Sequence, residues 1–268
     1  MREYVVRLSS LKNIKNVKKG TIFMPLAKER KLKLGGAEIL GIYGQNGSGK
    51  TAIVDTLFFL QRIMIGKELD QNLIDYIDID SSDAKVNAEF KIFGPNILFE
   101  VGYYINLIKQ NGEVKINREY LNCAINKDGI RTNKNIFIDY KYNEMECIFK
   151  PQKRLDEVVG KNQETKMDLI VARKIAEKSN CSYIFGESSR EILCKEYNND
   201  FKSYGIVIRE LFDFALKDLF VIRNTHSGMI TANFLLPMAF RVESDRIGMK
   251  GDFAIPLMKP AVLDAEKK

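Results

Sequence analysis

The chain has 268 residues and no Trp, with 45% hydrophobic and 29% charged residues. This balance is that of an ordinary globular protein and excludes wholesale disorder. The length allows one large domain or two small ones. The first residues carry no signal-peptide pattern, and the most apolar stretches are too short or too interrupted to cross a bilayer. We therefore expect a cytoplasmic protein that does not associate with membranes.

The net charge of +7 is concentrated in the first 50 residues, which hold 11 Lys/Arg against 3 Asp/Glu, whereas the remainder holds 31 against 32. Most of this basic excess lies between Lys12 and Lys33. Such a segment can attract polyphosphate or nucleic acid, or it can be the solvated face of a Lys-rich hairpin. The second interpretation is favoured because no nucleic-acid motif accompanies the charges. Nucleic acid stays a candidate partner of residues 12–33.

Cysteine and histidine usage argues against structural metal sites and disulfides. Cys123, Cys147, Cys181 and Cys194 are scattered, with no C-x-x-C pair, and the chain has one His. This spacing indicates neither a disulfide framework nor a zinc site. Reduced thiols are expected.

The first half of the chain predicts a glycine-rich loop between a strand and a helix. Short strands are expected at 4–8 and 20–26. Residues 38–43 form an apolar segment, read as a strand that runs into the loop. Residues 50–65 have apolar positions at helical spacing, and Gly66 is expected to end that helix.

Residues 84–149 predict an antiparallel meander. Two hairpin signals separate short β runs, because Asn111-Gly112 and Asp128-Gly129 accept positive φ at little cost. The expected strands are 85–93, 97–108, 113–125, 135–142 and 144–149.

The second half predicts a mainly helical lobe. Residues 151–163 are polar and indicate a linker, and helices are expected at 164–178 and 201–219. Residues 219–222 and 230–242 are apolar and are read as strands or a buried helix. We therefore expect a mixed α/β fold with a lobe at 1–150, carrying the glycine-rich loop and the antiparallel β subdomain, and a helical lobe at 151–268 that ends in apolar strands.

One motif carries chemistry. Residues 44–51 satisfy G-x-x-x-x-G-K-[ST] in full. The glycines let the backbone wrap closely around phosphates, and successive N–H groups form an anion nest at the start of a helix. The Lys50 ammonium can bridge β- and γ-phosphate oxygens, and the Thr51 hydroxyl can ligate Mg²⁺. The predicted nucleotide-binding residues are Gly44, Gln45, Asn46, Gly47, Ser48, Gly49, Lys50, Thr51 and Ala52.

The motif is specific. By average glycine usage it should occur by chance in on the order of one chain in a hundred of this length. Here it also follows an apolar segment and precedes an amphipathic helix, as a P-loop NTPase core requires. We predict that the ligands are ATP and Mg²⁺.

The segment EILGIYGQNGSGKTAIVDTLFFL, residues 38–60, resembles the P-loop region of ABC-class ATPases of the SMC and RecF type. Within that class it resembles bacterial AAA-family ATP-binding proteins of phage-defence loci. LKNIKNVKKGTI and LFVIRNTHSGMITANFLLPMAFRVE resemble the same group at the level of pattern. The resemblance implies an ABC-ATPase-like head that hydrolyses ATP, dimerises under nucleotide control and acts in DNA repair or phage defence. The second head, a homodimer copy or another subunit, would supply a signature motif.

The other motifs of that class are not found, so no catalytic residue is assigned. Residues 136–139 are apolar and then acidic, but Tyr140 follows where a catalytic Glu of a Walker B strand is expected. Residues 185–189 match a signature segment poorly and indicate a turn, and His226 fits a loop better than a switch. No Q-loop Gln can be assigned. We expect the chain to be the N-terminal part of an ATPase, with hydrolysis needing residues from elsewhere.

Three alternatives stay open. A non-hydrolysing, nucleotide-gated interaction module would explain the missing Walker B carboxylates. A GTPase needs D-x-x-G followed by N-K-x-D; residues 245–248 fit the first pattern, but they come too late and the second does not follow. A small-molecule kinase would need an acceptor site that the sequence does not show.

Overall fold

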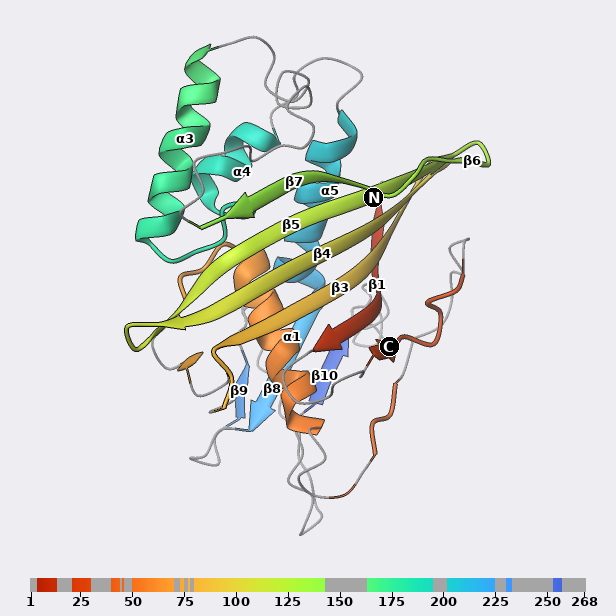
Figure 1. Ribbon diagram of the computed structural model, residues 1–268. Helices are drawn as coiled ribbons and strands as arrows, with labels where there is room; N and C mark the ends of the chain where they lie inside the picture. The colour runs from red at the N-terminus through yellow and green to blue at the C-terminus, as the bar shows by residue number, and fades with distance from the viewer. Residues whose placement is uncertain are drawn as a thin grey trace, which may run out of the picture.

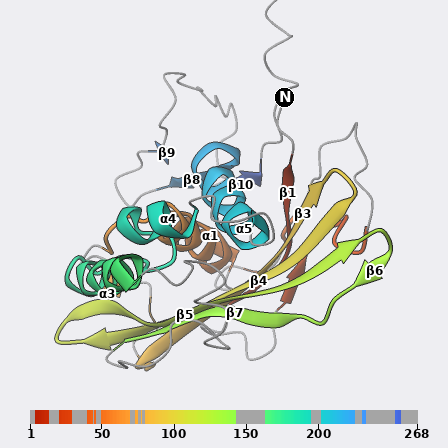
Figure 2. The same cartoon turned by 90° about the horizontal axis from the view of Figure 1, so that it is seen from above.

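The computed structural model describes residues 4–13, 21–29, 40–43, 45, 50–69, 73–74, 77, 80–142, 163–194, 202–224, 230–232 and 253–256. Over these residues the chain combines a long, curled antiparallel sheet with helices on one of its faces and a small second sheet beyond them (Figures 1 and 2). The mixed α/β class and the antiparallel subdomain are therefore confirmed. A P-loop NTPase core stays a prediction. None of the described helices is long and apolar enough to cross a membrane.

The main sheet has the order β2-β1-β3-β4-β5-β6, and β7 also pairs with β5. Every pairing in it is antiparallel, so the predicted meander is confirmed, with β1 added beside β3. The strands are β1 (Val5–Asn13), β2 (Thr21–Phe23), β3 (Asp83–Gly94), β4 (Ile97–Gln110), β5 (Glu113–Lys127), β6 (Ile130–Arg131) and β7 (Asn135–Lys141). The predicted strand at 144–149 lies outside the described residues.

Both predicted hairpin turns form, and their backbone angles show why. Asn111 and Gly112 have φ values of 52° and 78°, and Asp128 and Gly129 have 51° and 82°. Two consecutive positive φ values are the mark of a type I′ turn, whose twist matches that of the flanking strands. A third two-residue connection, Pro95-Asn96, joins β3 to β4 with a φ of 58° at Asn96.

The helices predicted at 50–65 and 164–178 are found closely in place, whereas α4 was not predicted. The 201–219 helix ends early, because its last turn widens into a π-helix and then becomes a strand. The elements are α1 (Lys50–Met64), α3 (Gln163–Lys178), α4 (Glu187–Leu193), α5 (Lys202–Asp213) and the π-helix η2 (Phe214–Asp218). The small antiparallel sheet, in the order β10-β8-β9, consists of β8 (Leu219–Asn224), β9 (Ile230–Ala232) and β10 (Phe253–Pro256).

The strand predicted at 38–43 is wrong over its described residues. Residues 40–43 belong to no strand, and Leu40, Ile42 and Tyr43 are 38%, 41% and 94% exposed. A strand needs a neighbour to accept and donate its backbone hydrogen bonds. In the described part of the chain no strand pairs with this segment. Its apolar composition alone was therefore not enough to form a strand.

One apolar core runs from β1 to β8 and joins both predicted lobes. The largest fully buried side chains come from α1, from the inner face of the main sheet and from the turn before α4. They include Leu60, Met64, Phe90, Phe99, Tyr103, Phe137, Tyr183 and Phe185. The boundary predicted at residue 150 falls outside the described residues.

A buried carboxylate ties the sheet to the turn before α4. Glu119 on β5 is fully buried and accepts hydrogen bonds from the Tyr103 hydroxyl at 2.7 Å and the Ser182 hydroxyl at 2.9 Å. It also accepts from the backbone N–H groups of Tyr183 and Ile184. Burial raises the pKa of Glu119, and these hydrogen bonds oppose that rise. We call these five residues the Glu119 network.

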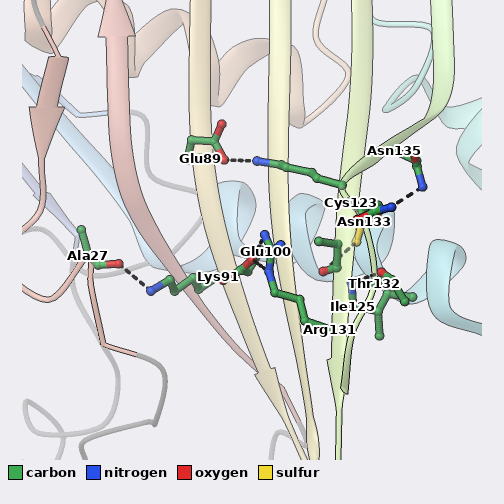
Figure 3. Close-up of polar contacts among 12 residues, drawn as sticks. Ala27, Glu89, Lys91, Glu100, Cys123, Ile125, Arg131, Thr132, Asn133 and Asn135 are labelled. Atoms are coloured by element: carbon green, nitrogen blue, oxygen red, sulfur yellow. Dashed lines mark hydrogen bonds and ion pairs between the residues drawn. The ribbon is translucent and has the colours of Figure 1, made fainter. Parts of the chain in front are cut away.

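The opposite face of the sheet is polar. Figure 3 shows Arg131 reaching the Glu100 carboxylate at 2.6 Å and Lys91 donating to the carbonyl of Ala27 at 2.5 Å. Lys134 pairs with Glu89 across two intervening strands. This is the alternation of inward apolar and outward polar side chains that one-sided burial requires.

Candidate nucleotide-binding site

The helix predicted to follow the P-loop begins at Lys50, the lysine of the motif. Its first turn contains no acidic residue. The first N–H groups of a helix have no partner within it, and the helix dipole places partial positive charge there. Lys50 adds a full positive charge to the first turn, so this end of α1 suits an anion.

The Lys50 side chain turns back toward its own loop. Its Nζ donates to the backbone carbonyl of Gln45 at 2.7 Å, in an exposed position. This bond holds the ammonium group beside the motif. An exposed bond to a neutral carbonyl is easily exchanged for a stronger bond to a phosphate oxygen.

The next two residues of the motif lie in the first turn of α1. Thr51 is exposed in the first turn of α1, so its hydroxyl is accessible to a metal–nucleotide ligand. Ala52 is half-buried, and its carbonyl accepts a hydrogen bond from the Thr56 hydroxyl at 2.6 Å. Gly44, Asn46, Gly47, Ser48 and Gly49 lie outside the described residues, so the amide nest stays a prediction.

The C-terminal end of α1 is capped by backbone hydrogen bonds. Gly66, with a φ of 69°, closes the helix: its N–H donates to Ile63, and the N–H of Lys67 donates to Arg62. This pair of bonds is a Schellman motif, and it confirms the predicted stop at Gly66. A Cβ built on Gly66 would lie 2.6 Å from the carbonyl oxygen of Phe185, so this end of the helix also abuts the turn before α4.

A buried amide fastens the side of the same helix. Gln61 is 5% exposed, and its Nε2 donates to the carbonyls of Ala215 and Leu219, the latter at 2.5 Å. These carbonyls belong to η2 and the start of β8, where the widened turn does not use them in regular α-helical bonds. The helix α1 is therefore anchored between the main sheet and the small sheet.

Asp139, the acidic residue of the 136–139 segment, is occupied by a structural ion pair. Its carboxylate is 1% exposed and accepts two bonds of 2.8 Å from the Arg118 guanidinium. Tyr140 stacks on Tyr183 on the helical side of the sheet, with ring centroids 5.5 Å apart. Side chains alternate along a strand, so Asp139 faces the opposite side from α1. It is not placed to act with Lys50 and Thr51.

Other predicted sites are only partly described. The turn predicted at 185–189 is present only at its start: residues 183–185 form a buried turn, whereas residues 187–189 belong to α4, which begins after Gly186. His226 and residues 245–248 lie outside the described residues, as do residues 14–20 and 30–33 of the basic segment at 12–33. Within the part of the chain that the structure describes, no three His, Cys, Asp or Glu side chains cluster as metal ligands.

Sequence reasoning missed two buried polar residues, although each left a signal. Glu119, Leu121 and Cys123 are alternate residues of β5 and all three are buried, so the Glu119 carboxylate lies on the inward face of the sheet. Gln61 falls among the buried positions of α1. Buried polar groups in folded proteins are mostly hydrogen-bonded, as the Glu119 carboxylate and the Gln61 Nε2 are here.

Comparison with protein-family models, curated proteins and solved structures finds no match to this chain. The site therefore has to be argued from its own residues. The described residues place the start of α1 at Lys50, the Lys50 ammonium beside the Gln45 carbonyl, and an exposed Thr51 one residue further on.

Proposed function

We propose that this chain binds Mg-ATP through residues 44–52. The observation that carries the proposal is a complete P-loop motif whose last two residues, Lys50 and Thr51, begin a helix with no acidic residue in its first turn. Lys50 exchanges the Gln45 carbonyl for β- and γ-phosphate oxygens, and Thr51 supplies a hydroxyl ligand to Mg²⁺. The backbone amides of the loop neutralise the remaining phosphate charge.

The resemblance to SMC- and RecF-type heads extends the proposal. We propose that bound nucleotide favours association of two heads, with the second supplying groups to the phosphates. ATP can shift that equilibrium only as far as its affinity for the paired state exceeds its affinity for the single head. Hydrolysis would then release the pair. DNA repair and phage defence are the settings that this resemblance implies.

A second candidate function is a nucleotide-gated interaction module that does not hydrolyse ATP. The Arg118–Asp139 pair favours it, because it removes the acidic residue that ends an apolar strand from any role beside Lys50. The two candidates differ in one measurement, the release of phosphate from Mg-ATP by the purified chain. Turnover that Lys50→Ala abolishes supports the ATPase, whereas tight binding without turnover supports the module.

Isothermal titration calorimetry with Mg-ATP tests the binding itself. Lys50→Ala removes charge-assisted hydrogen bonds worth about 1.5–3 kcal/mol, so the affinity should fall about 10- to 100-fold. Lys67→Ala, which removes an exposed lysine just beyond the other end of α1, is the matched control and should bind as the wild type does. Equal affinities in wild type and Lys50→Ala would contradict the role given to Lys50. Competition by GTP as strong as by ATP would favour the GTPase alternative.

A further inference from the structure

The helix α3 has an exposed apolar stripe on the side that it turns away from the core. Its inner side is buried through Leu169, Ala172 and Ala176. On its outer side Met167, Val171 and Ile175 are 65%, 55% and 46% exposed, and Ile170 beside them is 48% exposed. Large apolar side chains gathered on one exposed face mark an interaction surface more often than isolated ones do.

The stripe is straight. Met167, Val171 and Ile175 follow at intervals of four, which places them one above the other along the helix. Four exposed charged residues border the stripe: Glu164 and Asp168 toward the start of the helix, Lys174 and Lys178 toward its end. The apolar stripe thus runs along the helix, with acidic residues beside its N-terminal half and basic residues beside its C-terminal half.

This face is complementary to itself when reversed. Asp168 and Lys174 lie equally far from Val171 on either side, and so do Glu164 and Lys178. Met167 and Ile175 are likewise equidistant from Val171. If a second α3 is laid antiparallel with a two-fold axis at Val171, apolar residues meet apolar ones and each acidic residue meets a lysine. A parallel arrangement would oppose like charges instead.

We propose that α3 is a self-association surface, on which α3 of a second copy of this chain docks antiparallel. The two-fold axis passes beside Val171, Met167 packs on Ile175 of the second copy, and Asp168 pairs with Lys174 of the second copy. Such an isologous contact closes on itself, so it produces a dimer and no longer assembly.

The size of the surface sets the strength of the pair. A 16-residue helix is about 24 Å long, so a contact made by this helix alone falls below the roughly 1,200 Å² of standard stable complexes. We therefore expect a weak dimer, with a dissociation constant in the micromolar range or above.

The surface is separate from the nucleotide site. α3 lies beside α4, near the end of α1 that is remote from Lys50 (Figure 1), and the Leu69 N–H there donates to the Asn180 carbonyl at 3.0 Å. The proposal therefore goes beyond nucleotide binding and does not depend on it. Pairing through α3 should persist without ATP and in Lys50→Ala, which distinguishes it from nucleotide-gated association of heads.

Sedimentation velocity over a series of protein concentrations tests the surface. The wild type should shift from monomer to dimer as concentration rises, and Val171→Glu should stay monomeric because it places two carboxylates on the axis. Ile130→Glu, at a 76% exposed position in β6, is the matched control and should dimerise like the wild type. Both sites are exposed, so circular dichroism melts should match the wild type. A monomeric wild type at hundreds of micromolar, or a Val171→Glu dimer of unchanged strength, would overturn the proposal.

Charge reversal tests the pairing of the ends. Lys174→Glu with Lys178→Glu makes the face wholly acidic, and Glu164→Lys with Asp168→Lys makes it wholly basic. Each double variant should be monomeric alone, and an equimolar mixture should form heterodimers. Mixing without association would refute the pairing.

Cysteine cross-linking tests the direction. Met167→Cys mixed with Ile175→Cys should give a disulfide between the two chains under mild oxidation, at a rate well above that of the wild type with its own thiols. Met167→Cys alone should cross-link poorly. The reverse result would mean a parallel pair and would contradict the proposed geometry.

Discussion

The two ends of α1 differ in how they are held. The C-terminal end is closed by Gly66, abuts the carbonyl of Phe185 and is fastened through Gln61 to η2 and β8. At the N-terminal end, Lys50 bonds the Gln45 carbonyl in an exposed position. The Gln61 hydrogen bonds near the C-terminal end are buried, whereas the Lys50–Gln45 bond at the N-terminal end is exposed.

This difference shows how a ligand site can stay adaptable on a rigid support. Buried hydrogen bonds are costly to break, because each lost partner leaves a desolvated group unsatisfied. An exposed bond such as that of Lys50 costs little to exchange, because water or a phosphate can replace the carbonyl. Substitutions at the fastened end should therefore change stability, and substitutions at the open end should change binding.

The largest effect on stability is expected from the Glu119 network, which holds the turn against which Gly66 rests. Glu119→Ala removes the acceptor of four buried donors, so the free energy of unfolding should fall by about 3–5 kcal/mol. Urea denaturation measures this. Glu113→Ala, in a partly exposed pair with Lys115, is the control and should change the free energy by about 1 kcal/mol at most. Similar losses of unfolding free energy in the two variants would contradict the contribution proposed for the Glu119 network.

A smaller effect is expected at Gly66. Gly66→Ala puts a side chain at positive φ, which costs about 1–2 kcal/mol, and brings its Cβ to 2.6 Å from a backbone oxygen. The total loss should be about 2–3 kcal/mol. Gly112 has a φ of 78°, and a Cβ built on it meets nothing within 4 Å. Gly112→Ala should therefore lose only the stability that the positive φ costs, about 1–2 kcal/mol. Thermal melts of the two variants separate the close approach from the backbone angle, and equal losses would refute the close approach.

The smallest perturbation is chemical labelling of the Cys181 thiol, which needs no substitution. Cys181 follows Asn180 at the fastened end, and burial raises the pKa of its thiol to about 11 from an ordinary value of 9.0. At pH 8 the thiolate fraction is then about 100-fold lower than in an ordinary thiol, so alkylation by iodoacetamide should be slower by about that factor. The rate should keep rising with pH up to about 11. Peptide mass spectrometry reads this position separately, and a rate that levels off near pH 9 would mean that the site is open.

Local signals in the sequence predicted much of this fold. Asn-Gly and Asp-Gly set the hairpins, Gly66 set the end of α1, and apolar periodicity placed α1 and α3 to within a residue or so. Contacts between distant residues were not predictable in the same way. The bonds from Glu119 to residues 182–184 and from Gln61 to Ala215 join segments far apart in the chain, and no local pattern encodes a partner.

The same distinction explains the strand that was wrongly predicted over residues 40–43. Residues 40–43 have strand composition, but a strand is stabilised by a neighbour, and the described residues supply none. For the candidate site, the sequence specified the chemistry of the motif, and the structure added where α1 begins and how Lys50 is held. The pairing of Asp139 with Arg118 required the structure, because it depends on the register of β5 and β7.

Hydrogen–deuterium exchange with and without Mg-ATP tests the central claim most directly, because it reports both ends of α1 in one experiment. Mg-ATP should slow exchange in peptides covering residues 44–54, where backbone amides bind phosphate, and should leave residues 61–69 unchanged. Lys50→Ala should lose most of that protection. Exchange in residues 44–54 that Mg-ATP leaves unaltered at millimolar concentration would contradict the account.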